Sequence, residues 1–80
     1  MFRVLVKIET LAVDERIYTV RYYSQRTARG ARRYSAEILL GPADRIILDD
    51  DSVSNLEAKA KRLVPATLYS RALAARATAA

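Results

Sequence analysis

The spacing of apolar residues changes once along this chain of 80 residues, and that change limits the folds open to it. Up to residue 49, apolar side chains recur at about every second position, which is typical of β-strands. From Val53 onward they recur at spacings of three and four, which places them on one side of an α-helix. Strands followed by a helix predict one α+β domain over residues 1–80.

The alternating part of the chain divides into strands at its polar and turn-forming residues. Asp14 and Glu15 suit a hairpin turn, and Gly41-Pro42-Ala43-Asp44 is a strong turn signal. Residues 24–33 lack an apolar period and predict a long hairpin loop. Short links favour an antiparallel meander of four strands, with three as the alternative. The expected strands are residues 2–13, 16–23, 34–40 and 45–49.

The C-terminal part predicts a helix that is kinked or broken at Pro65, because proline cannot donate to the preceding turn. Either Ser52 or Ser54 can cap its first turn. Residues 74–80 have little to bury and are expected to fray.

The expected sheet carries apolar side chains on both faces. Phe2, Val4, Val6 and Ile8 are taken as the core side of the first strand. Either the segment after Pro65 or a second copy of the chain must then cover the other face. The apolar residues assigned to that other face are Leu5, Leu11, Ile17, Tyr23, Leu39 and Ile47.

The net charge of +5 is concentrated in one segment. Residues 21–33 contain five arginines and no acid, whereas the rest of the chain holds nine basic and nine acidic residues. Arginine matches phosphate geometry and tyrosine offers a stacking surface, so the segment predicts nucleic-acid binding through the phosphate backbone. The candidate residues are Arg21, Arg26, Arg29, Arg32, Arg33, Tyr22, Tyr23 and Tyr34.

Two other interpretations of the segment stay open. It can be a solvated loop, or it can bind an acidic protein. The apolar second face independently favours a homo-oligomeric or protein–protein interaction module, in which the arginines serve solubility.

The sequence gives no sign of catalysis, because it lacks His and Cys and therefore the commonest base, metal ligand and thiol nucleophile. Asp49, Asp50 and Asp51 do not fit a calcium loop and are interpreted as charge at a helix N-terminus. We therefore expect no enzyme activity, no cofactor and no metal.

Composition also bears on location. The absence of Cys, of a signal-peptide pattern and of a long apolar stretch predicts a cytoplasmic protein without membrane association. Eleven Arg against three Lys, with fourteen Ala, is a bias typical of GC-rich bacterial genomes.

Overall fold

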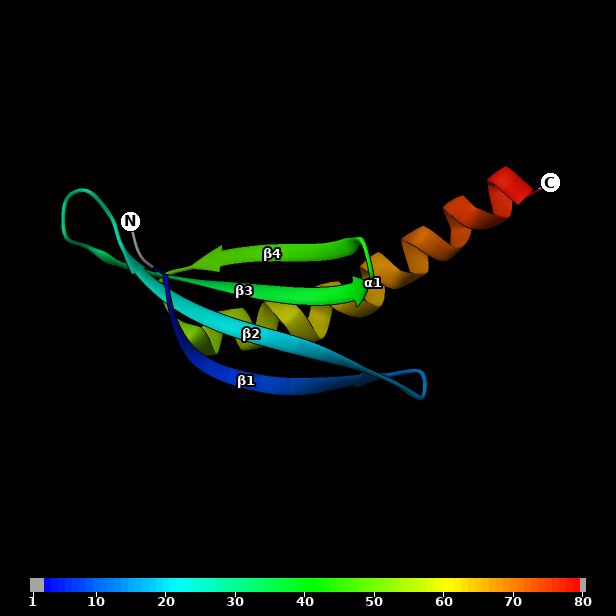
Figure 1. Cartoon of the computed structure of the whole chain (residues 1–80). Helices are drawn as coiled ribbons and strands as arrows, with labels where there is room; N and C mark the ends of the chain where they lie inside the picture. The colour runs from blue at the N-terminus through cyan, green and yellow to red at the C-terminus, as the bar shows by residue number, and fades with distance from the viewer. Residues whose placement is uncertain (1–2, 80) are drawn as a thin grey trace.

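The computed structural model describes residues 3–79 as one antiparallel sheet followed by one helix (Figure 1). The strands lie in the order β1-β2-β3-β4, each hydrogen-bonded to the next in sequence. The predicted α+β class and four-stranded meander are thereby confirmed. Phe2 and Ala80, which the sequence assigned to a strand and a tail, lie outside the described residues. The elements are β1 (Val4–Val13), β2 (Arg16–Arg26), β3 (Arg32–Gly41), β4 (Asp44–Asp50) and α1 (Val53–Ala79).

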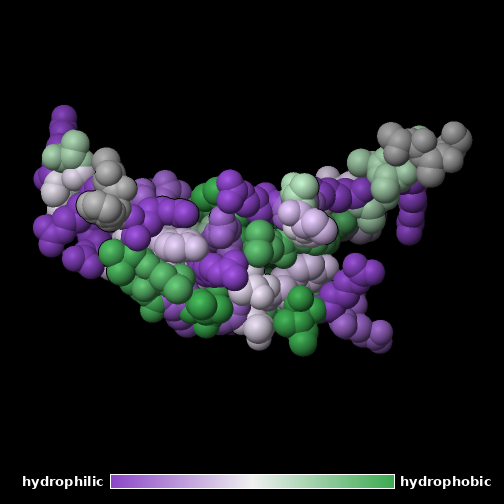
Figure 2. All heavy atoms as spheres, viewed as in Figure 1, coloured by the Kyte–Doolittle hydropathy of each residue, from purple (hydrophilic) through white to green (hydrophobic). Residues whose placement is uncertain are grey.

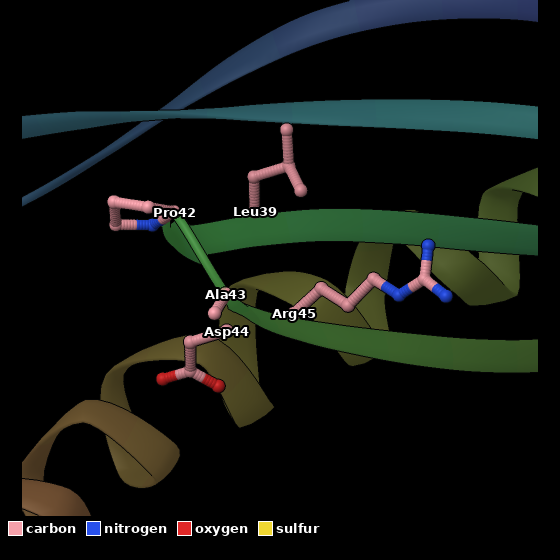
Figure 3. Close-up of a pocket in the computed structure, with 5 residues that line it drawn as sticks. All are labelled: Leu39, Pro42, Ala43, Asp44 and Arg45. Atoms are coloured by element: carbon pink, nitrogen blue, oxygen red, sulfur yellow. The ribbon is translucent and has the colours of Figure 1, made fainter.

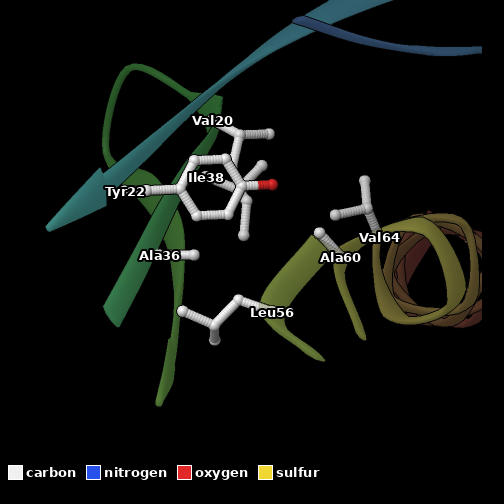
Figure 4. Packing of buried hydrophobic residues seen from close by; sticks show 7 residues of the cluster. All are labelled: Val20, Tyr22, Ala36, Ile38, Leu56, Ala60 and Val64. Carbon is white, nitrogen blue, oxygen red and sulfur yellow. The ribbon is translucent and has the colours of Figure 1, made fainter. Parts of the chain in front are cut away.

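α1 covers one face of the sheet, and the core lies between them. The alternation predicted for β2 and β3 turns every second side chain of these strands toward the helix. The matching stripe of α1 has spacings of four residues, as one helix face requires. Figure 4 shows these side chains converging from the two strands and the helix. The core consists of Val20, Tyr22, Ala36, Ile38, Leu56, Ala60 and Val64.

The hairpin between β1 and β2 forms where Asp14 and Glu15 predict it. Both residues have positive φ, 49° and 69°. Two central residues with positive φ are the mark of a type I′ turn, whose twist matches that of the flanking strands.

β1 presents the opposite residues to the helix from those the sequence suggested. Its register with β2 shifts between Leu5 and Lys7, a β-bulge that reverses the alternation beyond it. Leu11, assigned to the outer face, packs against the core. Ile8, assigned to the core, pairs with Arg21 and is 55% exposed. The predicted core side of the first strand was therefore wrong for these residues.

The loop between β2 and β3 is shorter than predicted. β2 continues to Arg26 and β3 begins at Arg32, so only residues 27–31 remain outside the strands. Ser24 is buried and pairs with Tyr34, while Gln25 pairs with Arg33. The side chains at these ends of β2 and β3 are polar. Their alternation between the two faces therefore leaves no hydrophobic period in the sequence.

α1 continues through Pro65 as one helix, so of the two predicted alternatives the break is wrong and the kink stays a prediction. Val64 and Leu68, on either side of the proline, pack against the core and hold this part of the helix on the sheet. The helix is described as far as Ala79, and the fraying predicted for residues 74–80 stays a prediction.

Ser52, rather than Ser54, caps α1. Its Oγ accepts a hydrogen bond of 3.1 Å from the backbone N–H of Asn55, three residues further along the chain. This contact satisfies one of the N–H groups that a helix start leaves without an intrahelical partner.

Candidate interaction surfaces

The five arginines of the basic segment do not form one surface. Side chains alternate between the two faces of a strand, so Arg21 and Arg33 lie on the side away from α1. Arg26 and Arg32 lie on the side of the buried residues Ser24 and Ala36. Arg29 is at the tip of the hairpin. The structure therefore separates residues that the sequence grouped together.

Arg33 is paired with acidic residues from the end of β4. Its guanidinium contacts the Asp51 carboxylate, and its Nη2 lies 3.9 Å from Oδ2 of Asp49. This tertiary pairing leaves Arg33 without an uncompensated positive charge for a phosphate.

Tyr22 belongs to the core and has no exposed surface. Its phenolic hydroxyl donates a hydrogen bond of 2.6 Å to the Glu9 carboxylate. Burial, followed by this bond to Glu9, raises the pKa of Tyr22. The stacking role predicted for Tyr22 is therefore wrong, because no base can reach its ring.

Glu9 connects Tyr22 to the helix through Lys7. The Lys7 Nζ lies 3.2 Å from Oε2 of Glu9 and 2.9 Å from Oε1 of Glu57 on α1. The hydrogen bond from Tyr22 holds the pKa of Glu9 below its usual value, and the bond to Glu57 raises the pKa of Lys7. These contacts join β1, β2 and α1, and no local pattern in the sequence signals them.

The other two tyrosines of the predicted site, Tyr23 and Tyr34, also make contacts within the chain. The guanidinium of Arg3 lies 4.2 Å from the centre of the Tyr23 ring, on the face opposite the helix. Tyr34 is half-buried and packs against the core. Neither ring stands free at the hairpin tip.

The loop at residues 27–31 is held by its own hydrogen bonds. The Thr27 N–H donates to the Ala31 carbonyl at 2.8 Å, and the Gly30 N–H donates to the Thr27 carbonyl at 2.9 Å. The Thr27 Oγ1 accepts a third bond from the Ala31 N–H at 3.2 Å. Gly30 has φ of +82°, a conformation that side chains disfavour.

The arginines that flank and form this loop have no acidic partner. Within residues 3–79, no ion pair joins Arg26, Arg29 or Arg32 to a carboxylate. All three side chains are exposed. Of the eight predicted site residues, the structure thus brings three together as uncompensated cations.

The sheet face that α1 leaves uncovered, here called the open face, carries many large apolar side chains. Figure 2 views this side and shows hydrophobic groups gathered over β1, with smaller ones along the sheet. Ile17 is 73% exposed and Ile47 is 55% exposed. By alternation, the exposed apolar residues of the open face are Leu5, Ile8, Ile17, Leu39 and Ile47.

Most charges on the open face are paired within the chain. Arg45 Nη1 lies 2.8 Å from the largely buried Glu37 carboxylate on the neighbouring strand. Ser35, also on this face, is buried, and its Oγ has no hydrogen-bond partner in the described structure. The open face therefore carries exposed apolar side chains beside charges that are mostly paired, such as Glu37 between Ile8 and Ile47.

A pocket of about 270 Å³ lies at the turn between β3 and β4 (Figure 3). It is smaller than most ligand sites, which measure about 300–1,000 Å³. Its two charged residues are already paired, Asp44 with Arg71 on α1 and Arg45 with Glu37. No nucleophile and base converge among the lining residues Leu39, Pro42, Ala43, Asp44 and Arg45.

The three consecutive aspartates divide between two sets of partners. Asp50 lies 2.6 Å from Lys59 and accepts a hydrogen bond from Asn55 Nδ2 at 3.0 Å. These two bonds, that from Lys59 first, hold the pKa of Asp50 far below its usual value. Asp49 and Asp51 face Arg33 instead. Among residues 3–79, no group of three potential metal ligands occurs.

Comparisons with known proteins do not assign a family. No protein-family model matches the chain, and neither a search of curated proteins nor one of solved structures finds a match. α1, the one helix of the described chain, lacks an apolar stretch long enough to cross a lipid bilayer.

Proposed function

We propose that this protein is a non-catalytic interaction module that forms a homodimer through the open face of its sheet. The observation that carries the proposal is the apolar character of that face, where Ile8, Ile17 and Ile47 are each more than half exposed. Several large apolar side chains left exposed on one sheet face are a feature of interaction sites in soluble proteins. A second copy of the chain is the occupant we infer.

The accessible surface supports a dimer of ordinary size. The chain of 9.0 kDa exposes 5800 Å², whereas a compact monomer of this mass exposes about 4,900 Å². The excess resembles the roughly 800 Å² that each partner buries in a standard interface. The projecting end of α1 contributes to this excess as well, so the area supports the proposal without defining the interface.

The charges on the open face oppose self-association only weakly, because most of them are paired within the chain. A two-fold interface places the same patch on both partners, so unpaired like charges would face each other. The pairing of Arg45 with Glu37 limits that repulsion. Arg3, which lies over the Tyr23 ring, and Arg21 are the cations of this face without an ion pair within residues 3–79.

Sedimentation velocity over a range of protein concentrations tests the proposal. We expect the wild-type protein to sediment as a dimer and the double variant Ile8→Lys/Ile47→Lys as a monomer. Both side chains are largely exposed in the single chain, so the variant should retain the far-ultraviolet circular dichroism of the wild type.

Tyr69→Lys is the matched control, because Tyr69 is 67% exposed but lies on α1. We expect this variant to remain dimeric. A monomeric wild type, or dissociation by the Tyr69 substitution alone, would refute the open face as the interface.

Nucleic-acid binding, the role predicted first from the sequence, remains a proposal for Arg26, Arg29 and Arg32 alone. The cytoplasmic location, the bacterial origin and the lack of enzyme activity also stay predictions.

A further inference from the structure

We propose that the tip of the β2–β3 hairpin binds the phosphodiester backbone of duplex nucleic acid through Arg26, Arg29 and Arg32. This site lies on a different part of the molecule from the proposed dimer interface, and the two proposals stand or fall separately.

Arg26 and Arg32 form an unfavourable pair of like charges. Arg26 and Arg32 are directly opposite each other in the register of β2 and β3, so their side chains leave the same face. Like charges at opposed positions destabilise a strand pair. Within residues 3–79 no carboxylate compensates them, whereas the neighbouring Arg33 is compensated by Asp49 and Asp51. An anion bound between the two guanidinium groups would remove the repulsion.

The loop that carries Arg29 is ordered by its own hydrogen bonds. Three hydrogen bonds between Thr27, Gly30 and Ala31 fix the backbone of the turn. A site with a fixed backbone loses less conformational freedom when a ligand binds. The cations are thus presented by an ordered hairpin end.

The β2–β3 hairpin projects from the rest of the sheet. Figure 1 shows that this hairpin extends beyond the other strands, at the end of the sheet remote from the C-terminus of α1. The acidic residues at the end of β4 reach Arg33 but pair with none of the three arginines nearer the tip. The tip therefore keeps its positive potential and is accessible to a large polyanion.

The choice of ligand follows from which groups the tip offers. Guanidinium groups match phosphate oxygens in geometry, and several phosphates in a row suit several arginines. Single-strand binding proteins add aromatic rings on which bases stack. Here Tyr22 is buried, Tyr23 lies against Arg3 and Tyr34 packs on the core. The tip therefore favours backbone contacts to a duplex over base stacking.

Fluorescence anisotropy with a labelled DNA duplex tests this site. Three phosphate contacts predict a slope of about −2.7 for log K against log salt. Affinity should then fall about 40-fold between about 50 mM and about 200 mM salt. We expect the variant Arg26→Gln/Arg29→Gln/Arg32→Gln to lose nearly all of this binding, and duplexes of different sequence to bind alike.

The control carries the same loss of charge elsewhere. Lys61, Arg62 and Arg76 are exposed on α1, and their simultaneous change to Gln should leave most of the duplex affinity intact. Circular dichroism verifies that both triple variants are folded.

Several results would overturn the assignment. These are no retention of duplex by the wild type at low salt, an equal loss in both triple variants, or stronger binding to a single strand than to the duplex. Equal binding of a polyglutamate peptide would show that the tip recognises acidic protein rather than phosphate.

Discussion

At the scale of single residues, Tyr22 has a structural role where the sequence suggested a binding role. Its ring fills the core, and its hydroxyl donates to Glu9, which in turn contacts Lys7. A buried hydroxyl needs such a partner, because an unsatisfied polar group costs about 1–3 kcal/mol. Tyrosine next to arginine in a sequence therefore does not by itself indicate a stacking surface.

The contact between Tyr22 and Glu9 predicts a measurable effect on stability. Tyr22→Phe should lower the free energy of unfolding by about 1.5–3 kcal/mol, because it removes a hydrogen bond to a charged acceptor. Tyr69→Phe, on an exposed tyrosine of α1, should change it little. Urea denaturation at neutral pH measures both, and equal effects of the two substitutions would contradict the role given to Tyr22.

The pKa directions of this pair set a pH dependence. The folded pKa of Tyr22 is raised, so its contribution is complete below the unfolded value of about 10 and is lost as pH rises through the folded pKa. The folded pKa of Glu9 is lowered, so its contribution is present above about 4.3 and is lost as pH falls through the folded value. Wild type should therefore lose stability above about pH 10 more steeply than Tyr22→Phe.

At the scale of elements, the two prolines differ in the secondary structure that surrounds them. Pro65 lies inside α1, where it removes a backbone donor, whereas Pro42 lies in the turn between β3 and β4. Both side chains are exposed, so replacement by alanine changes backbone effects more than packing.

The two Pro→Ala variants should therefore shift stability in opposite directions. Pro65→Ala should raise the free energy of unfolding, by up to about 3 kcal/mol, because alanine restores the donor and suits a helix interior. Pro42→Ala should lower it by about 0.4–1 kcal/mol, because the unfolded chain gains freedom. Chemical denaturation of both variants gives the signs, and a destabilised Pro65→Ala would contradict an uninterrupted helix.

The elements also show what local patterns can predict. Alternation identified the inward residues of β2 and β3, such as Val20 and Ile38, because their ladder is regular there. It failed on β1, where the bulge inverts the faces of Leu11 and Ile8. The removal of Arg33 from the predicted arginine site could not be foreseen either. Its contact with Asp51 depends on the pairing of β4 with β3, which no local pattern reveals.

At the scale of the whole molecule, the shape is elongated. The radius of gyration is 14.4 Å and the extents are 50 × 23 × 20 Å, whereas a compact domain of this length has a radius near 12 Å. The end of α1 accounts for part of this length, since residues 69–77 are exposed. A small core and a large surface limit the stability that a single chain of this size can reach.

Dimerisation should therefore make thermal unfolding depend on protein concentration. When unfolding also separates two chains, the Tm rises with total concentration by mass action. We expect the Tm to rise with concentration in wild type and to stay constant in Ile8→Lys/Ile47→Lys. Circular dichroism at protein concentrations that span about a hundredfold in the micromolar range measures both. A wild-type Tm that is constant over that range would argue against the dimer.

The bulge between Leu5 and Lys7 has a consequence for how far such association can proceed. β1 is an outermost strand, and a straight outermost strand can template the addition of further chains without limit. An irregular edge interrupts the even row of N–H and C=O groups that such growth requires. The dimer proposed above would use the broad side of the sheet and end with two chains, while the irregular edge discourages fibril growth.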